Sequence, residues 1–148
     1  MTVLDAGVVV AGLLGESGRA RAEELLRDRS DPPVMNGVNA GEVVARLGRS
    51  GEGALSDVLR KMVWLKHGGL ELVNFDAFDG HAAGALRAKY FDRKSRQVSF
   101  GDCAALATCI RFGHGLATTD RTLALLARHL GIEVVPVANS SGELPLER

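Results

Sequence analysis

The chain has 148 residues, of which 46% are apolar and 24% are charged, and its 18 basic and 18 acidic side chains give a formal net charge of zero. This length and composition fit one globular domain with a sizeable core, and they exclude a strongly basic polyanion-binding protein. There is no apolar run near the roughly 18 residues of a membrane span, and the N-terminus has no visible secretory or transit signal. We therefore expect a cytoplasmic protein with no membrane partner.

Apolar patterns and Gly or Pro breaks predict an alternation of short strands and helices. In chain order, the first half is expected to hold a strand at 2–4, helices at 7–14 and 17–29, a strand at 34–38, and helices at 39–47 and 54–67. The second half is expected to hold a strand at 70–73, helices at 76–90 and 99–112, a strand at 116–118, a helix at 121–130 and a strand at 133–136. This order predicts an α/β fold whose central parallel five-stranded sheet is covered by helices on both faces.

Two stretches are weaker than the rest of this pattern. The strand at 34–38 is poor in β-branched residues and is interrupted by Gly37. The polar segment from Ala138 onwards, with Ser140-Ser141-Gly142, is expected to be loose. No linker or internal repeat divides the chain, so we predict one domain at 1–137 followed by a polar tail at 138–148.

Four acidic residues stand where an apolar, strand-like run is expected to give way to a helix. They are Asp5, Glu42, Asp102 and Asp120. In a parallel sheet the strand ends gather along one edge, where ligands bind, so acids far apart in sequence can share a pocket. Carboxylates in one pocket repel one another unless cations compensate, and such hard oxygen ligands suit Mg²⁺ or Mn²⁺. The pattern points to metal-assisted phosphodiester chemistry.

Each of these acids also has an ordinary alternative as a helix cap. Asp5 and Asp120 can be N-caps, while 39–42 and 99–102 approximate or match a capping box. Taken one at a time, capping is the simpler interpretation.

The surroundings of two acids favour a shared site instead. Glu42 and Asp102 lie inside unusually apolar stretches, where an unpaired charge is costly. The neighbouring Gly41 and Gly101 leave room for a ligand to approach the backbone. Capping and metal binding are also compatible, because a helix N-terminus helps to keep a carboxylate ionised, as a metal ligand requires.

Four motifs in this order resemble those of the PIN domain, most closely its VapC-type toxin branch. They are Asp5 after an apolar strand, Asn39-Ala40-Gly41-Glu42-Val43-Val44, Ser99-Phe100-Gly101-Asp102-Cys103-Ala104-Ala105-Leu106-Ala107 and Leu116-Ala117-Thr118-Thr119-Asp120-Arg121. The resemblance spans Val3 to Pro136. It implies a PIN-like three-layer sandwich and an Mg²⁺- or Mn²⁺-dependent endoribonuclease. It also implies the toxin role in a type II toxin–antitoxin system, with an RNA substrate, a cognate antitoxin and a homodimer.

The same resemblance assigns roles to residues. It implies that Asp5 and Asp102 hold the metal, that Glu42 and Asp120 complete the site directly or through water, and that Thr118 is the hydroxyl residue two before the last acid. A metal-bound water is the expected nucleophile. The general base and the number of ions stay open. One departure is that Ala6 and Gly7 follow the first acid, where family members often have a small hydroxyl residue.

Two further features allow more than one interpretation. A basic run precedes the Asp102 helix and either guides an RNA backbone or is a solvated loop: Arg87, Lys89, Arg93, Lys94 and Arg96. An apolar set in the 54–67 helix suits either a protein interface or the core: Leu55, Leu59, Met62 and Val63.

Other functional classes fit less well. A haloacid-type phosphatase wants a second Asp where Gly7 stands, a receiver domain wants an acidic pair at the first strand, and a Rossmann module wants a glycine-rich turn after it. The alternative that stays open is a PIN-like domain serving as a non-catalytic RNA- or protein-binding module. The presence of all four acids disfavours it.

Overall fold

The structure, a computed structural model, describes residues 1–51 and 53–146. The strands of its sheet are β1 Thr2–Leu4, β2 Val34–Asn36, β3 Glu71–Val73, β4 Gly115–Thr118 and β5 Val134–Pro136. They pair in the order β3-β2-β1-β4-β5, and every pairing is parallel. The α/β fold with a parallel five-stranded sheet is therefore confirmed.

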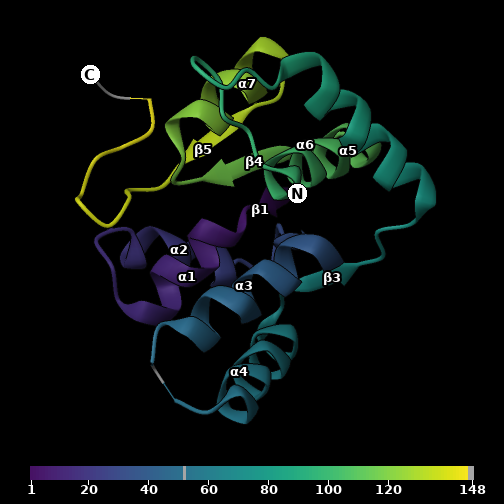
Figure 1. Cartoon of the computed structure of the whole chain (residues 1–148). Helices are drawn as coiled ribbons and strands as arrows, with labels where there is room; N and C mark the ends of the chain where they lie inside the picture. Colours follow the sequence, from purple (N-terminus) through teal and green to yellow (C-terminus); the bar gives the residue numbers. More distant parts are fainter. Residues whose placement is uncertain (52, 147–148) are drawn as a thin grey trace.

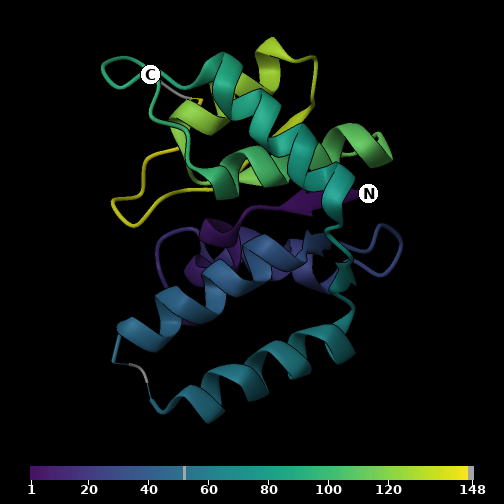
Figure 2. The same ribbon diagram turned by 45° about the vertical axis from the view of Figure 1, so that its right-hand side comes forward.

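Helices cover both faces of this sheet. In the described residues they are α1 Ala6–Leu14, α2 Arg19–Arg27, α3 Gly37–Arg49, α4 Leu55–Gly68, α5 Ala77–Tyr90, α6 Phe100–Phe112 and α7 Arg121–His129. In Figure 2, α1 to α4 lie in the lower part of the molecule and α5 to α7 in the upper part. None of the described helices is long and apolar enough to cross a membrane.

Alternation along the strands divides the core into two apolar layers. Leu4 and Ala117 pack with the helices on the α1–α4 side, whereas their strand neighbours Val3 and Leu116 pack with those on the α5–α7 side. Successive strand residues point to opposite faces, so each central strand supplies both layers. This is why the strands are apolar runs and not alternating ones.

The strand order makes β1 the turning point of the topology. From β1 the chain builds outwards through β2 and β3, and it then returns to place β4 and β5 on the other side of β1 (Figure 1). The crevice at the carboxyl ends of the strands next to such a switch point is the usual ligand site in open α/β sheets. Asp5 follows β1 directly, and Asp120 lies two residues after the end of β4.

The second strand is shorter than predicted, and the helix after it begins earlier. The Asn36 side chain accepts a hydrogen bond from the Asn39 backbone N–H at 2.9 Å, so Asn36 is the N-cap and α3 begins at Gly37. The capping box proposed for 39–42 is therefore wrong. Glu42 lies in the second turn of α3, and capping does not explain its presence.

The polar tail is structured where it leaves the sheet. Val137 is fully buried, and its backbone N–H donates to the Thr118 carbonyl oxygen at 3.0 Å. The Asn139 side chain then accepts hydrogen bonds from the backbone N–H groups of Ser141 and Glu143, each at 3.0 Å. The expectation of a loose segment is wrong for residues 138–143, because this side-chain turn closes the backbone locally.

Candidate active site

A cleft of about 500 Å³ opens at the carboxyl ends of β1 and β4. The four acids singled out in the sequence all line it: Asp5, Glu42, Asp102 and Asp120. They come from the end of β1, the second turn of α3, the first turn of α6 and the N-cap of α7. The fold thus brings together side chains that are up to 115 positions apart in the chain.

Asp5 has the most unusual environment of the four. It is only 6% exposed, and although it occupies the N-cap position of α1, its side chain makes no capping hydrogen bond. Burial, with added repulsion from Asp102 and Glu42, raises the pKa of its carboxyl group to about 7. The capping interpretation therefore fails for Asp5, and the buried charge needs another explanation.

Thr118 lies beneath the cleft, not in its lining. Its hydroxyl is fully buried, donates to Asp5 Oδ2 at 3.1 Å and accepts from the Asp120 backbone N–H at 3.0 Å. One side chain thus joins the first acid to the last. The contact partly offsets the rise in the Asp5 pKa, and it fixes the orientation of that carboxylate.

Asp102 and Asp120 cap helices and also line the cleft. Asp102 Oδ2 accepts from the Ser99 backbone N–H at 2.6 Å, and Asp120 Oδ1 accepts from the Leu123 backbone N–H at 2.7 Å. Burial raises the pKa of Asp102 against the lowering effect of the Ser99 contacts, and the charges of Asp120 and Glu42 add to the rise. The two interpretations of these acids are therefore compatible, because capping leaves carboxylate oxygen lone pairs available.

Glu42 reaches the cleft because α6 has a glycine opposite it. A Cβ added to Gly101 would lie 2.6 Å from Glu42 Oε2, so any side chain there would displace the carboxylate. Arg46, one turn further along α3, lies 4.0 Å from Glu42 Oε1 and also lines the cleft. Both side chains are more than a third exposed, so this ion pair compensates the acidic cluster only weakly.

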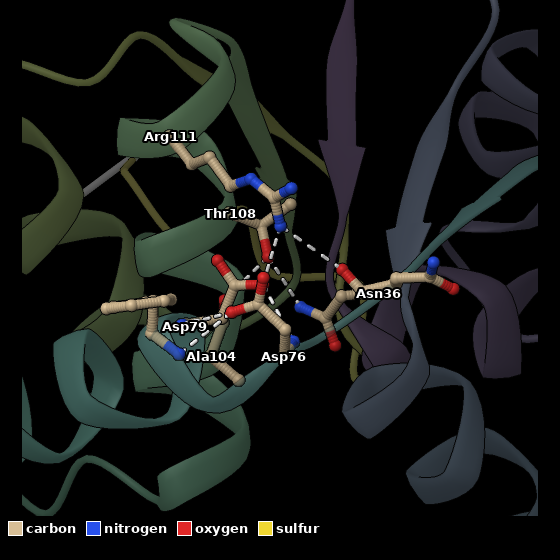
Figure 3. Close-up of polar contacts among 8 residues, drawn as sticks. Asn36, Asp76, Asp79, Ala104, Thr108 and Arg111 are labelled. Atoms are coloured by element: carbon tan, nitrogen blue, oxygen red, sulfur yellow. Dashed lines mark hydrogen bonds and ion pairs between the residues drawn. The ribbon is translucent and has the colours of Figure 1, made fainter.

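A buried amide network behind the cleft joins α3 to α6. Asn36 Nδ2 donates to Asn39 Oδ1 at 2.7 Å and to Thr108 Oγ1 at 2.8 Å, as Figure 3 shows for Thr108. Asn39 Nδ2 in turn donates to the Gly101 carbonyl oxygen at 3.1 Å. The network holds the helices of Glu42 and Asp102 together. The sequence motifs do not predict this network, although Asn36 and Asn39 are polar residues in an apolar stretch.

The basic run does not line the cleft. Arg87 lies over the Phe91 ring at 4.5 Å, and Lys89 and Arg96 lie over the Tyr90 ring. The segment after α5 forms a tight turn in which Asp92 and Arg96 exchange backbone hydrogen bonds. The cations in the described cleft lining are Arg46 and Arg121.

The donor set suits a divalent cation in charge and chemistry, because all four acids offer hard oxygen ligands and repel one another. In the part of the chain that the structure describes, however, no group of three or more His, Cys, Asp and Glu side chains is arranged so that it could hold a metal ion. Mg²⁺ commonly binds one or two carboxylates and keeps several waters, so a closed cage of protein ligands is not required. The acids therefore suit such an ion in charge and in donor type.

Comparison with known families identifies the class of protein to which this fold and cleft belong. The sequence profile of the PIN domain matches residues 2–138, so this chain belongs to the PIN domain family. No curated protein matches the sequence.

The similar solved structures are VapC toxins and related toxin–antitoxin proteins. VapC20 from Mycobacterium tuberculosis, described as a sarcin-ricin loop cleaving toxin, is 14% identical with a TM-score of 0.64, over 78% of this chain and 87% of that one. VapBC2 from Rickettsia felis, bound to a promoter DNA fragment, is 16% identical with a TM-score of 0.66, over 90% and 96%. A toxin–antitoxin complex from Klebsiella pneumoniae is 16% identical with a TM-score of 0.61, over 84% and 90%. At these identities the likeness shows the shared fold.

Proposed function

We propose that this protein is a metal-dependent endoribonuclease and the toxin of a type II toxin–antitoxin system, acting in the cytoplasm. The observation that carries the proposal is the Asp5 carboxyl group, which is buried beside two other acids of one cleft and whose pKa is raised to about 7. Clustered, buried carboxylates of this kind disfavour folding unless a cation or a proton compensates them. Membership in the PIN family and the toxins of the same fold support the proposal.

The proposed roles follow from where each side chain lies. Asp5 and Asp102 would hold Mg²⁺ or Mn²⁺, with Glu42 and Asp120 as further ligands directly or through water. When bound, such an ion supplies an activated water and stabilises charge on the scissile phosphate. Thr118, through its hydrogen bond at 3.1 Å, keeps Asp5 in one orientation and favours its ionised form. The carboxylates themselves would orient the attacking water.

RNA also needs cations beyond the metal. Arg46 and Arg121 line the cleft, and the turn that carries Arg93, Lys94 and Arg96 precedes the N-terminus of α6, which supplies Asp102. We propose that this turn guides the RNA backbone. Replacing its three cations by Ala should weaken RNA binding severalfold and flatten its salt dependence, as measured by fluorescence anisotropy at several salt concentrations. Unchanged binding would refute the guiding role.

An exposed apolar stripe on α4 supports a protein partner. Leu55, Leu59 and Val63 recur every four residues and are 58%, 49% and 55% exposed, and Trp64 beside them is 70% exposed. Met62, by contrast, belongs to the core. We propose that the cognate antitoxin covers this stripe and that the protein forms a homodimer. Several of the similar structures are toxin–antitoxin complexes.

One experiment tests the central proposal. Purified protein is incubated with total RNA and Mg²⁺ or Mn²⁺, beside a sample with EDTA and a sample of the Asp5→Asn variant. We expect cleavage only in the unsubstituted protein with metal. Cleavage that survives both controls excludes the metal-nuclease assignment. RNA binding without cleavage in any sample identifies the alternative, a non-catalytic binding module.

A further inference from the structure

The turn between α1 and α2 is in direct contact with the segment that follows β5. A Cβ added to Gly18 would overlap the carbonyl oxygen of Ala138 and would lie 2.7 Å from Val137 Cγ1. Gly18 itself has φ −78° and ψ 0°, which any residue adopts. Position 18 therefore requires glycine for space and not for backbone conformation. The neighbouring Ser17 hydroxyl donates to the Ser140 carbonyl oxygen at 3.3 Å.

The segment seated in this way, which we call the 138–143 loop, forms part of the cleft. Asn139 and Ser140 line the same cleft as the four acids, as does Glu16 from the α1–α2 turn. The loop is internally braced, because the Asn139 side chain bonds to the backbone of Ser141 and Glu143. The contact at Gly18 thus sets the position of one wall of the cleft.

The residue of this wall that is free to contact a ligand is Ser140. It is exposed, and its hydroxyl donates to no group among the residues that the structure describes. The Asn139 amide oxygen, by contrast, already accepts hydrogen bonds within the loop. In a cleft lined by more acids than cations, a neutral donor can bind a phosphate or ribose oxygen without adding to the repulsion.

We propose that Gly18 is a positioning residue that seats the 138–143 loop so that Ser140 contacts the RNA strand next to the scissile phosphate. The inference rests on the proposed function in that the ligand is RNA. A side chain at position 18 pushes the Ala138 backbone away from the α1–α2 turn and moves Ser140 with it. RNA binding is then weakened, while the four acids and Thr118 keep their places on other elements.

The test measures RNA binding in the non-cleaving Asp5→Asn background with Mg²⁺. Anisotropy of a labelled, mixed-sequence single-stranded oligoribonucleotide is recorded for Gly18→Ala, for Ser140→Ala and for Gly84→Ala. Gly84 lies in α5, and a Cβ added to it meets nothing within 4 Å, so it is the matched glycine control. We expect Kd to rise about fivefold or more for the first two variants, because each loses a neutral hydrogen bond to the RNA. The Kd of the control variant should stay unchanged.

Two readouts separate this role from a structural one. In the otherwise unsubstituted enzyme, Gly18→Ala should raise KM for RNA cleavage with little change in kcat, whereas partial unfolding lowers kcat. Ser140→Ala removes only an exposed hydroxyl, so its fold is retained. If either variant binds RNA as tightly as the Gly84→Ala control, or if the parent does not bind RNA, the inference is wrong. Because binding is measured apart from cleavage, a protein that binds RNA without cleaving it overturns the proposed catalysis and not the role of the loop.

Discussion

Two buried aspartates lie near opposite ends of α6, and they differ in what surrounds them. Asp5 and Asp79 are each 6% exposed. Asp79 Oδ2 accepts a hydrogen bond from Arg111 near the C-terminal end of α6 at 2.6 Å and another from the Asp76 backbone N–H at 3.0 Å (Figure 3). Asp5 lies beside the N-terminal end of α6. It accepts a hydrogen bond from the Thr118 hydroxyl and lies near the like charges of Asp102 and Glu42.

The comparison teaches that burial of an acid does not by itself indicate function. Asp79 has a guanidinium partner and one backbone donor, the Asp76 N–H, so its charge is compensated within the fold, and its role is to join α5 to α6. Asp5 is buried against like charges, and no ion pair compensates it among the described residues. A charge that the protein leaves uncompensated is the one to examine for an external cation.

The largest contrast is expected from Asp5→Asn. Removing this carboxylate should lower kcat/KM for RNA cleavage by about 10³-fold, because several kcal/mol of charge stabilisation through the metal are lost. The same change should leave the protein at least as stable at neutral pH, because the raised pKa shows that the fold disfavours the ionised form. Steady-state kinetics and urea unfolding measure the two effects. A variant that stays active would remove Asp5 from the proposed site.

The pH dependence of stability sharpens the same contrast. Burial raises the pKa of Asp5 from its ordinary value of 3.8 to about 7, so the folded state holds a proton that the unfolded chain releases between these pH values. The stability that this proton contributes is a few kcal/mol. It is fully present below about pH 4 and is lost as the pH rises through 7. The free energy of unfolding of Asp5→Asn minus that of the unsubstituted protein, without divalent metal, should therefore increase from pH 4 to pH 8.

Added Mg²⁺ provides the control for this titration. Because metal ligands must be deprotonated, Mg²⁺ should stabilise the unsubstituted protein more at pH 8 than at pH 5, and Asp5→Asn less at either pH. A difference between the two proteins that does not vary with pH would show that Asp5 ionises normally. It would also remove the electrostatic support for a cation at the cleft.

The opposite outcome is expected for Asp79→Asn. The substitution removes the charge opposite Arg111 but keeps an oxygen that can accept from the Asp76 backbone N–H. Because the Arg111 side chain is 42% exposed and can be solvated, the loss of stability should be about 1–2 kcal/mol, less than for a fully buried pair. Metal-dependent cleavage, measured well below the unfolding temperature, should be unaffected. A loss of activity equal to that of Asp5→Asn would end the distinction between the two acids.

Local patterns in the sequence were sufficient for the sheet and for the positions of the acids. The strand–helix alternation and the helix caps depend on residues that are close together in the sequence. Asp5, Asp102 and Asp120 could therefore be placed at helix starts without a structure. What could not be predicted depends on partners far away in the chain. The Asn36–Thr108 bond joins residues 72 apart, and the Ser17–Ser140 bond joins residues 123 apart. A local pattern does not show which distant partner such a polar residue binds.

The smallest effect is expected from Gly101→Ala, which tests how closely α3 and α6 must approach each other at the cleft. In Gly101→Ala the new Cβ would lie 2.6 Å from Glu42 Oε2, so the Glu42 side chain must rotate away, although the backbone position is helical and tolerates alanine. We expect kcat/KM to fall about tenfold, the cost of displacing one of four carboxylates, with stability nearly unchanged. Gly41→Ala is the matched control, because a Cβ at that helical position meets nothing within 4 Å. Equal activities for the two variants would mean that the position of Glu42 does not limit the reaction.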